Sequence, residues 1–146
     1  MHKDFYASGF LYRPSTGQIL LQQPKSNSDI QSPWSMFEME NLQAENAGAT
    51  FRRIIQKLLH VKLNVDSIYP VYEYFCKDKN KTYQIIYAEL EDINDFSPKN
   101  GTKFAWFSFK QTLRLPLTEQ ARHDIVIGER VIDSKERKSL GQQTLD

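Results

Sequence analysis

Residues 39–61, MENLQAENAGATFRRIIQKLLHV, carry the pattern that decides the fold. Between residues 47 and 59 the apolar side chains recur at helical spacing on one broad stripe, namely Ala47, Phe51, Ile54, Ile55, Leu58 and Leu59. No proline interrupts this run. The pattern predicts an amphipathic helix that packs its apolar face against a core.

Strand-like segments stand on both sides of this predicted helix. The expected strands are residues 5–13, 18–23, 34–37, 67–76, 82–90 and 104–109, and a second helix is expected from Leu117 to about Lys135. Such a mixed order predicts an α/β protein with helices on both faces of a sheet. His123 and Asp124 are neighbours on the second helix, so their side chains should diverge, and we expect both on its surface.

The composition is that of one ordinary globular domain. At 146 residues the chain can bury a core, and 40% hydrophobic with 25% charged residues does not favour disorder. A net charge of +1 gives no reason to expect a nucleic-acid or membrane partner. Cys76 is the only cysteine, and no signal peptide or membrane-spanning run is visible, so we expect a cytoplasmic protein. We expect the domain over residues 1–137 and a polar tail over 138–146.

Short motifs in four places resemble one known family. They are ASGFL at 7–11, QILLQ at 18–22, WSMF at 34–37 and WFSFK at 106–110. Together with the order of the elements, they make residues 5 to 132 similar to the Nudix hydrolase family, of the MutT-like kind. The resemblance implies an α/β/α sandwich with a mixed sheet between two main helices. It also implies hydrolysis of nucleoside diphosphates linked to another group, with Mg²⁺ or Mn²⁺ as the cofactor.

The family's signature box falls on the quoted stretch. The box is a glycine, five residues, a glutamate, seven residues, and then Arg-Glu-apolar-x-Glu-Glu-x-Gly-apolar. Either Arg52 or Arg53 could be the box arginine. The register with Arg53 also matches Glu45 as the upstream glutamate and Ile55 and Val61 as the apolar residues, whereas the register with Arg52 loses that glutamate. We therefore prefer Arg53.

The metal-binding acids of the box are missing in either register. With Arg53 as the box arginine, these glutamates fall on Ile54, Lys57 and Leu58, and the closing glycine falls on His60. Hard divalent cations need several oxygen ligands, and a lysine at this place would repel them. The resemblance therefore predicts the fold, together with weak or absent metal-dependent activity.

Other carboxylates could replace the missing ones. Glu38, Glu40 and Glu45 precede the helix, and three carboxylates near one another can ligate Mg²⁺ or Mn²⁺. Solvated carboxylates on a loop are the alternative. For Glu45 the family also implies a pair with Arg53 that holds the loop against the helix, and no metal is needed for that.

The same region offers candidates for direct ligand binding. Arg53 and Lys57 are four positions apart and line one side of the helix, where they could hold phosphate without a metal. A solvated basic face is the alternative. Trp34 and Phe37 are candidates to stack on a base, with core packing as the alternative.

Two functions from different classes are consistent with these residues. The first is a Nudix-type hydrolase whose metal ligands come from residues 38–45 or from later strands. The second is a non-catalytic Nudix-like module that binds a nucleotide-type small molecule or a protein partner. Either could form a homodimer.

Overall fold

The core of the molecule is a mixed sheet of six strands. The computed structural model describes residues 4–91, 96 and 100–145. Its elements are β1 (Phe5–Arg13), β2 (Gln18–Gln23), β3 (Phe37–Glu40), α1 (Ala47–Leu59), a 3₁₀ turn (Val65–Ser67), β4 (Ile68–Cys76), β5 (Lys81–Glu89), β6 (Lys103–Ser108), α2 (Phe109–Thr112) and α3 (Glu119–Leu145). The strand order is β4-β5-β1-β2-β6, and β3 also pairs with β1. β1 and β5 run parallel, whereas the four other described pairs are antiparallel.

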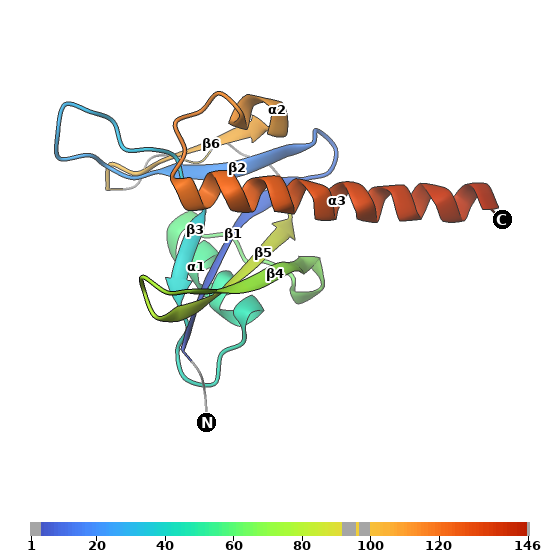
Figure 1. Cartoon of the computed structure of the whole chain (residues 1–146), viewed down its shortest axis with the longest axis horizontal. Coiled ribbons are helices and arrows are strands. Elements are labelled where there is room, and N and C mark those ends of the chain that lie inside the picture. Colours follow the sequence, from blue (N-terminus) through green and yellow to red (C-terminus); the bar gives the residue numbers. More distant parts are fainter. Residues whose placement is uncertain (1–3, 92–95, 97–99, 146) are drawn as a thin grey trace.

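The two long helices lie on opposite faces of the sheet (Figure 1). Side chains alternate along β1 as they do along any strand. Ala7 and Leu11 pack in one core cluster with the buried face of α1. Phe10 and Tyr12 pack in a second cluster with the buried face of α3. The chain is therefore an α/β/α sandwich, as the sequence predicted.

The centre of the sheet depends on Gly9. Gly9 lies opposite Ile86 in the parallel pair of β1 and β5. A Cβ atom at Gly9 would collide with the backbone carbonyl of Ile86 and would lie 3.2 Å from the ring of Phe51. The absence of a side chain therefore lets β1, β5 and α1 pack closely together.

The helix predicted from the quoted stretch is confirmed. α1 spans Ala47–Leu59, and Phe51 and Ile55 on its apolar stripe are fully buried. Asn46 caps its N-terminus by accepting a hydrogen bond from the backbone N–H of Ala49 at 2.8 Å. At the other end His60 adopts the left-handed conformation, with φ of 58°.

Several strand boundaries differ from the prediction, most of them by one residue. The short strand begins at Phe37 and ends at Glu40, because its partner is β1, whereas Trp34 makes only an isolated bridge with Leu117. The last strand ends at Ser108 instead of residue 109. Ser108 caps α2 with a reciprocal capping box, so the chain turns into a helix there.

The final helix is longer than predicted. α3 continues ten residues past Lys135, to Leu145, so the expected polar tail is helical as far as residue 145, and residue 146 lies outside the described residues. Its last fully buried residue is Ile132, and the helix then extends beyond the sheet (Figure 1). None of the helices in the described part of the chain is both long and apolar enough to cross a membrane.

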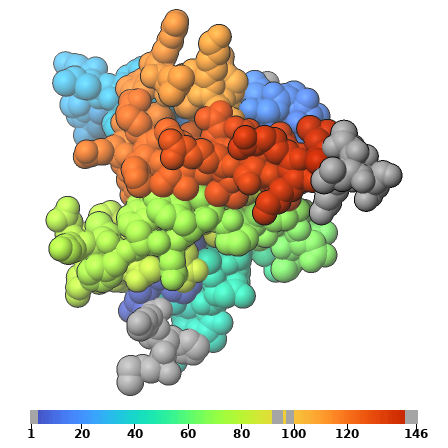
Figure 2. Space-filling view, turned by 45° about the vertical axis from the view of Figure 1, so that its right-hand side comes forward, coloured from blue at the N-terminus to red at the C-terminus, as the bar shows by residue number. Residues whose placement is uncertain are grey.

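The surface position expected for Asp124 is wrong. Figure 2 shows α3 across one face of the molecule with β4 directly alongside. At this contact Asp124 is fully buried, and its carboxylate accepts hydrogen bonds from the hydroxyls of Tyr72 and Tyr74. The side chain of His123 is 68% exposed, as expected, but it does not diverge from Asp124, because its Nδ1 lies 3.3 Å from the Asp124 carboxylate and 3.1 Å from the hydroxyl of Tyr72. Burial of the Asp124 carboxylate is tolerated because the two tyrosine hydroxyls donate hydrogen bonds to it in place of water.

Candidate functional site

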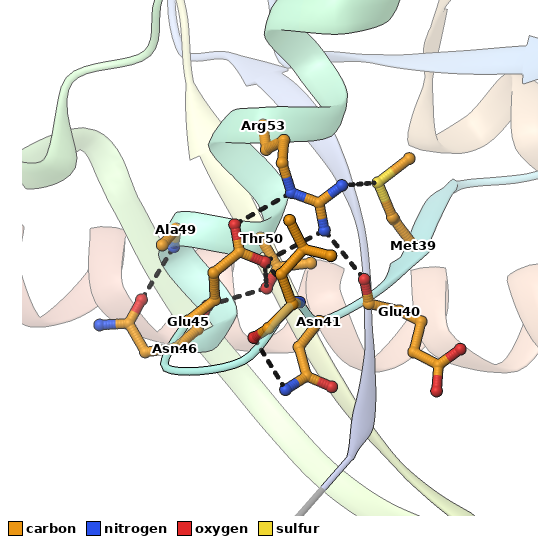
Figure 3. Close-up of polar contacts among 9 residues, drawn as sticks. Met39, Glu40, Asn41, Glu45, Asn46, Ala49, Thr50 and Arg53 are labelled. Carbon is orange, nitrogen blue, oxygen red and sulfur yellow. Dashed lines mark hydrogen bonds and ion pairs between the residues drawn. The ribbon is translucent and has the colours of Figure 1, made fainter. Parts of the chain in front are cut away.

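The loop before α1 is held by a network centred on Glu45 (Figure 3). One carboxylate oxygen accepts from the backbone N–H of Leu42 at 2.7 Å, from the Thr50 hydroxyl at 3.1 Å and from Nη2 of Arg53 at 3.0 Å. The other oxygen accepts from Nε of Arg53 at 2.9 Å. The hydrogen bond from Arg53 is the main reason why the pKa of Glu45 lies below its ordinary value. The pair that the family resemblance implied is therefore present.

The guanidinium of Arg53 makes two further contacts on the β3 side. Nη2 also donates to the backbone carbonyl of Glu40 at 3.0 Å, and Nη1 lies 2.8 Å from the sulfur of Met39. These contacts, with those to Glu45, engage Nε and both terminal nitrogens. Direct binding of phosphate by Arg53 would therefore require the loop to release it. Lys57, the other predicted phosphate ligand, is exposed in the last turn of α1.

The structure distinguishes between the two box registers. Arg53 pairs with Glu45, as the box arginine should, whereas Arg52 donates from Nε to the backbone carbonyl of Leu63 at 3.1 Å. In the Arg53 register the closing glycine falls on His60, whose positive φ is the conformation that glycine favours. Both observations support the register with Arg53.

Two of the three box positions for metal ligands are apolar residues in or against the core. Ile54 is 3% exposed and belongs to the cluster between α1 and the sheet. Leu58 is half-buried against the same cluster, near which Phe104 and Trp106 also pack. Lys57 is the third position, and it brings a positive charge. These residues do not fit a Mg²⁺ or Mn²⁺ ion, because none of them supplies an oxygen ligand.

The three carboxylates proposed as substitutes are not brought together. Glu38 lies 3.9 Å from Lys79, and Glu40 forms an ion pair with Lys81, both on the hairpin between β4 and β5. Glu45 is engaged by Arg53 instead. Burial is the main reason why the pKa of Glu38 lies above its ordinary value. Across residues 4–91, 96 and 100–145, the structure contains no group of three or more His, Cys, Asp or Glu side chains that could hold a metal ion.

The two aromatic candidates lie on opposite faces of the sheet. Phe37 is fully buried on the α1 side and stacks on Phe104, with ring centroids 6.1 Å apart. It is a core residue, so it cannot stack on a base as proposed. Trp34 packs on the α3 side, edge-on to Phe107 at 4.9 Å, and is half-buried. The sheet therefore separates the two rings that were candidates to stack on a base.

Comparison with known proteins finds similar folds among solved structures. No model of a protein family matches the chain, and no curated protein matches it. Solved structures do match. The Nudix hydrolase RenU from M. smegmatis is 16% identical over 89% of this chain and 86% of its own, with a TM-score of 0.66.

Two further matches were solved with a bound partner. The NUDIX domain of Shewanella oneidensis NrtR, in complex with ADP ribose, is 14% identical over 90% of each chain, with a TM-score of 0.65. The C-terminal domain of mouse MUTYH, in complex with human PCNA, is 14% identical over 90% of this chain and 91% of its own, with a TM-score of 0.66. At such identities the likeness concerns architecture alone. Element order, helix placement and these neighbours agree, and the chain has the Nudix fold.

Proposed function

We propose that this chain is a Nudix-fold module that binds a nucleotide-type small molecule and has weak or absent metal-dependent hydrolytic activity. The observation that carries the proposal is the state of the three box positions. Ile54 and Leu58 belong to or pack against the apolar core, and Lys57 is a cation. The divalent ion that would neutralise a diphosphate and activate water has no ligands on this helix.

The network at Glu45 supports a structural role for what is left of the box. A carboxylate that accepts four hydrogen bonds from its own loop and helix has little capacity left for a cation. Arg53 at the same time offsets its negative charge. The box therefore keeps the part that shapes the loop and lacks the part that performs chemistry.

The ligand class is proposed from the fold. The NUDIX domain of NrtR was solved with ADP ribose, which supports a nucleotide-type ligand here. The MUTYH domain, solved with PCNA, supports a second candidate, a module that binds a protein partner. Both candidates share weak or absent hydrolysis, and they differ in whether a free nucleotide binds.

Two measurements test the proposal. Phosphate release from ADP ribose and a panel of nucleoside di- and triphosphates, with about 5 mM Mg²⁺ or Mn²⁺ to saturate weak sites, should give no turnover above a no-protein control. Calorimetric titration of ADP ribose without metal should give saturable heat. Turnover that Glu45→Gln abolishes would establish the hydrolase instead, and the absence of heat at millimolar ligand would exclude the nucleotide and leave the protein partner.

A further inference from the structure

A cavity of about 420 Å³ lies between the first turns of α1 and the strands β4 and β5. It exists because residues 47–49 of α1 are Ala-Gly-Ala, so no long side chain fills the space over this edge of the sheet. A Cβ at Gly48 would still be 4.0 Å from the nearest atom of Ile68. Small-molecule sites commonly measure roughly 300 to 1,000 Å³, so the cavity has a suitable size.

The lining of the cavity combines an apolar wall with a few polar groups. The apolar side chains come from the helix start, the segment after it and the two strands, and they are Ala47, Ala49, Val65, Ile68, Pro70 and Ile86. The polar side chains are Asn46, Arg52 and Gln84. None of the described lining residues is acidic, so Arg52 gives the cavity a positive charge. An apolar body with a negatively charged group would match this lining.

Arg52 is the charged residue of the lining, and one hydrogen bond holds its side chain. Its Nε donates to the carbonyl of Leu63, which is 2% exposed, and this bond fixes the plane of the guanidinium. Within the described part of the chain, its terminal nitrogens have no hydrogen-bond or ion-pair partner. A planar guanidinium with free donors binds carboxylate and phosphate oxygens well.

The cavity is separate from the box side of α1. Arg53 contacts Glu40 and Met39 on the β3 side, whereas Arg52 donates to Leu63 and lines both the cavity and a neighbouring hollow beside residues 62–65. Adjacent residues on a helix face different directions, so α1 contributes Arg53 to the box side and Arg52 to the cavity side. The box positions 54, 57 and 58 do not line the cavity.

We propose that this cavity binds a small organic anion, with its carboxylate or phosphate oxygens on Arg52 and a compact apolar body against Ile68 and Ile86. The N–H groups in the first turn of α1 add to the attraction for an anion at this end of the helix. The proposal is independent of the proposed function, since neither a nucleotide nor a metal is required.

The test is an NMR titration of the full chain with three matched probes. Phenyl phosphate and phenylacetate carry the two anionic groups on similar bodies, and benzyl alcohol is the neutral counterpart. The expected result is saturable shifts of Gly48, Ala49 and the Gln84 side-chain amide with at least one anion, and binding of benzyl alcohol at least tenfold weaker. The stronger anion identifies phosphate or carboxylate as the preferred group. Shifts elsewhere only, or equal binding of the neutral probe, would overturn the proposal.

Three variants locate the site. Arg52→Met keeps an apolar stem and should weaken anion binding about tenfold, which corresponds to 1.4 kcal/mol. Gly48→Leu should block the cavity while favouring the helix, because leucine has the higher helix propensity. Arg130→Met removes an exposed charge on α3 and should leave binding unchanged. With dispersed spectra confirming that each variant folds, unchanged binding in both cavity variants would refute the site.

Discussion

Replacement of Glu45 by glutamine should destabilise the protein at neutral pH. Glutamine keeps the shape, but it turns a fourfold acceptor into a group with one oxygen, and its NH₂ must face a donor. A hydrogen bond to a charged group contributes about 1.5–3 kcal/mol when it is well shielded. Because the side chains of Arg53 and Glu45 are 31% and 19% exposed, solvent screens part of this energy. We expect a loss of about 1–2 kcal/mol in the free energy of unfolding.

The loss of stability in Glu45→Gln should also depend on pH, and the pKa shift of Glu45 gives the sign of that dependence. The pKa of Glu45 is lowered in the folded state, mainly by the hydrogen bond from Arg53. Its stabilising effect is therefore complete above the unfolded pKa of about 4.5 and disappears as the pH falls through the folded value. The difference between wild type and Glu45→Gln should be present at pH 7 and should be smaller at pH 3.

Urea denaturation at both pH values, followed by tryptophan fluorescence, measures this difference. Glu73→Gln is the matched control, since Glu73 is exposed on β4, and its effect should stay within about 0.5 kcal/mol. A variant as stable as wild type at pH 7, or equally destabilised at both pH values, would show that the carboxylate does not hold the loop in the way described.

Three further substitutions test the packing. Gly9→Ala should cost more than about 2 kcal/mol in thermal or urea unfolding, since the new methyl group meets the carbonyl of Ile86. Tyr74→Phe removes a donor 3.2 Å from the buried Asp124 carboxylate and should cost about 1–2 kcal/mol in the same assay; no loss would mean that Tyr72 alone satisfies the charge. Ile54→Glu should cost at least about 3 kcal/mol, and a stable variant would contradict the buried position.

The helix and the first two strands could be predicted from the sequence because each has a strong local signal. α1 has an apolar stripe with a capping asparagine, and β1 and β2 flank a turn in which Gly17 takes a φ of 69°. The position of β3 could not be predicted in the same way. A stretch of four mostly apolar residues does not show which of them pair, and here pairing with β1 begins at Phe37.

The burial of Asp124 could have been predicted from the helical spacing of the apolar residues around it. The buried residues of α3 include Ala121, Ile125 and Ile132, which recur at helical spacing. Position 124 is three residues after the first of these, so it falls on the same stripe. Its neighbour His123 lies off the stripe. What the sequence could not show is that Tyr72, fifty-two residues earlier in the chain, would supply the hydrogen bond that makes burial of the carboxylate tolerable.

The cavity and the box have one thing in common. Both depend on the contacts that two neighbouring arginines, Arg52 and Arg53, make on different sides of α1. The sequence allowed both Arg52 and Arg53 as the box arginine and favoured Arg53, because that register matches more box positions. Contacts with Glu45 on one side and Leu63 on the other separate them. With that register, a glutamate restored at Ile54 would enter the apolar core instead of an open metal site. Restoring the glutamate at position 54 would therefore cost packing, and a ligand is better sought on the Arg52 side of α1.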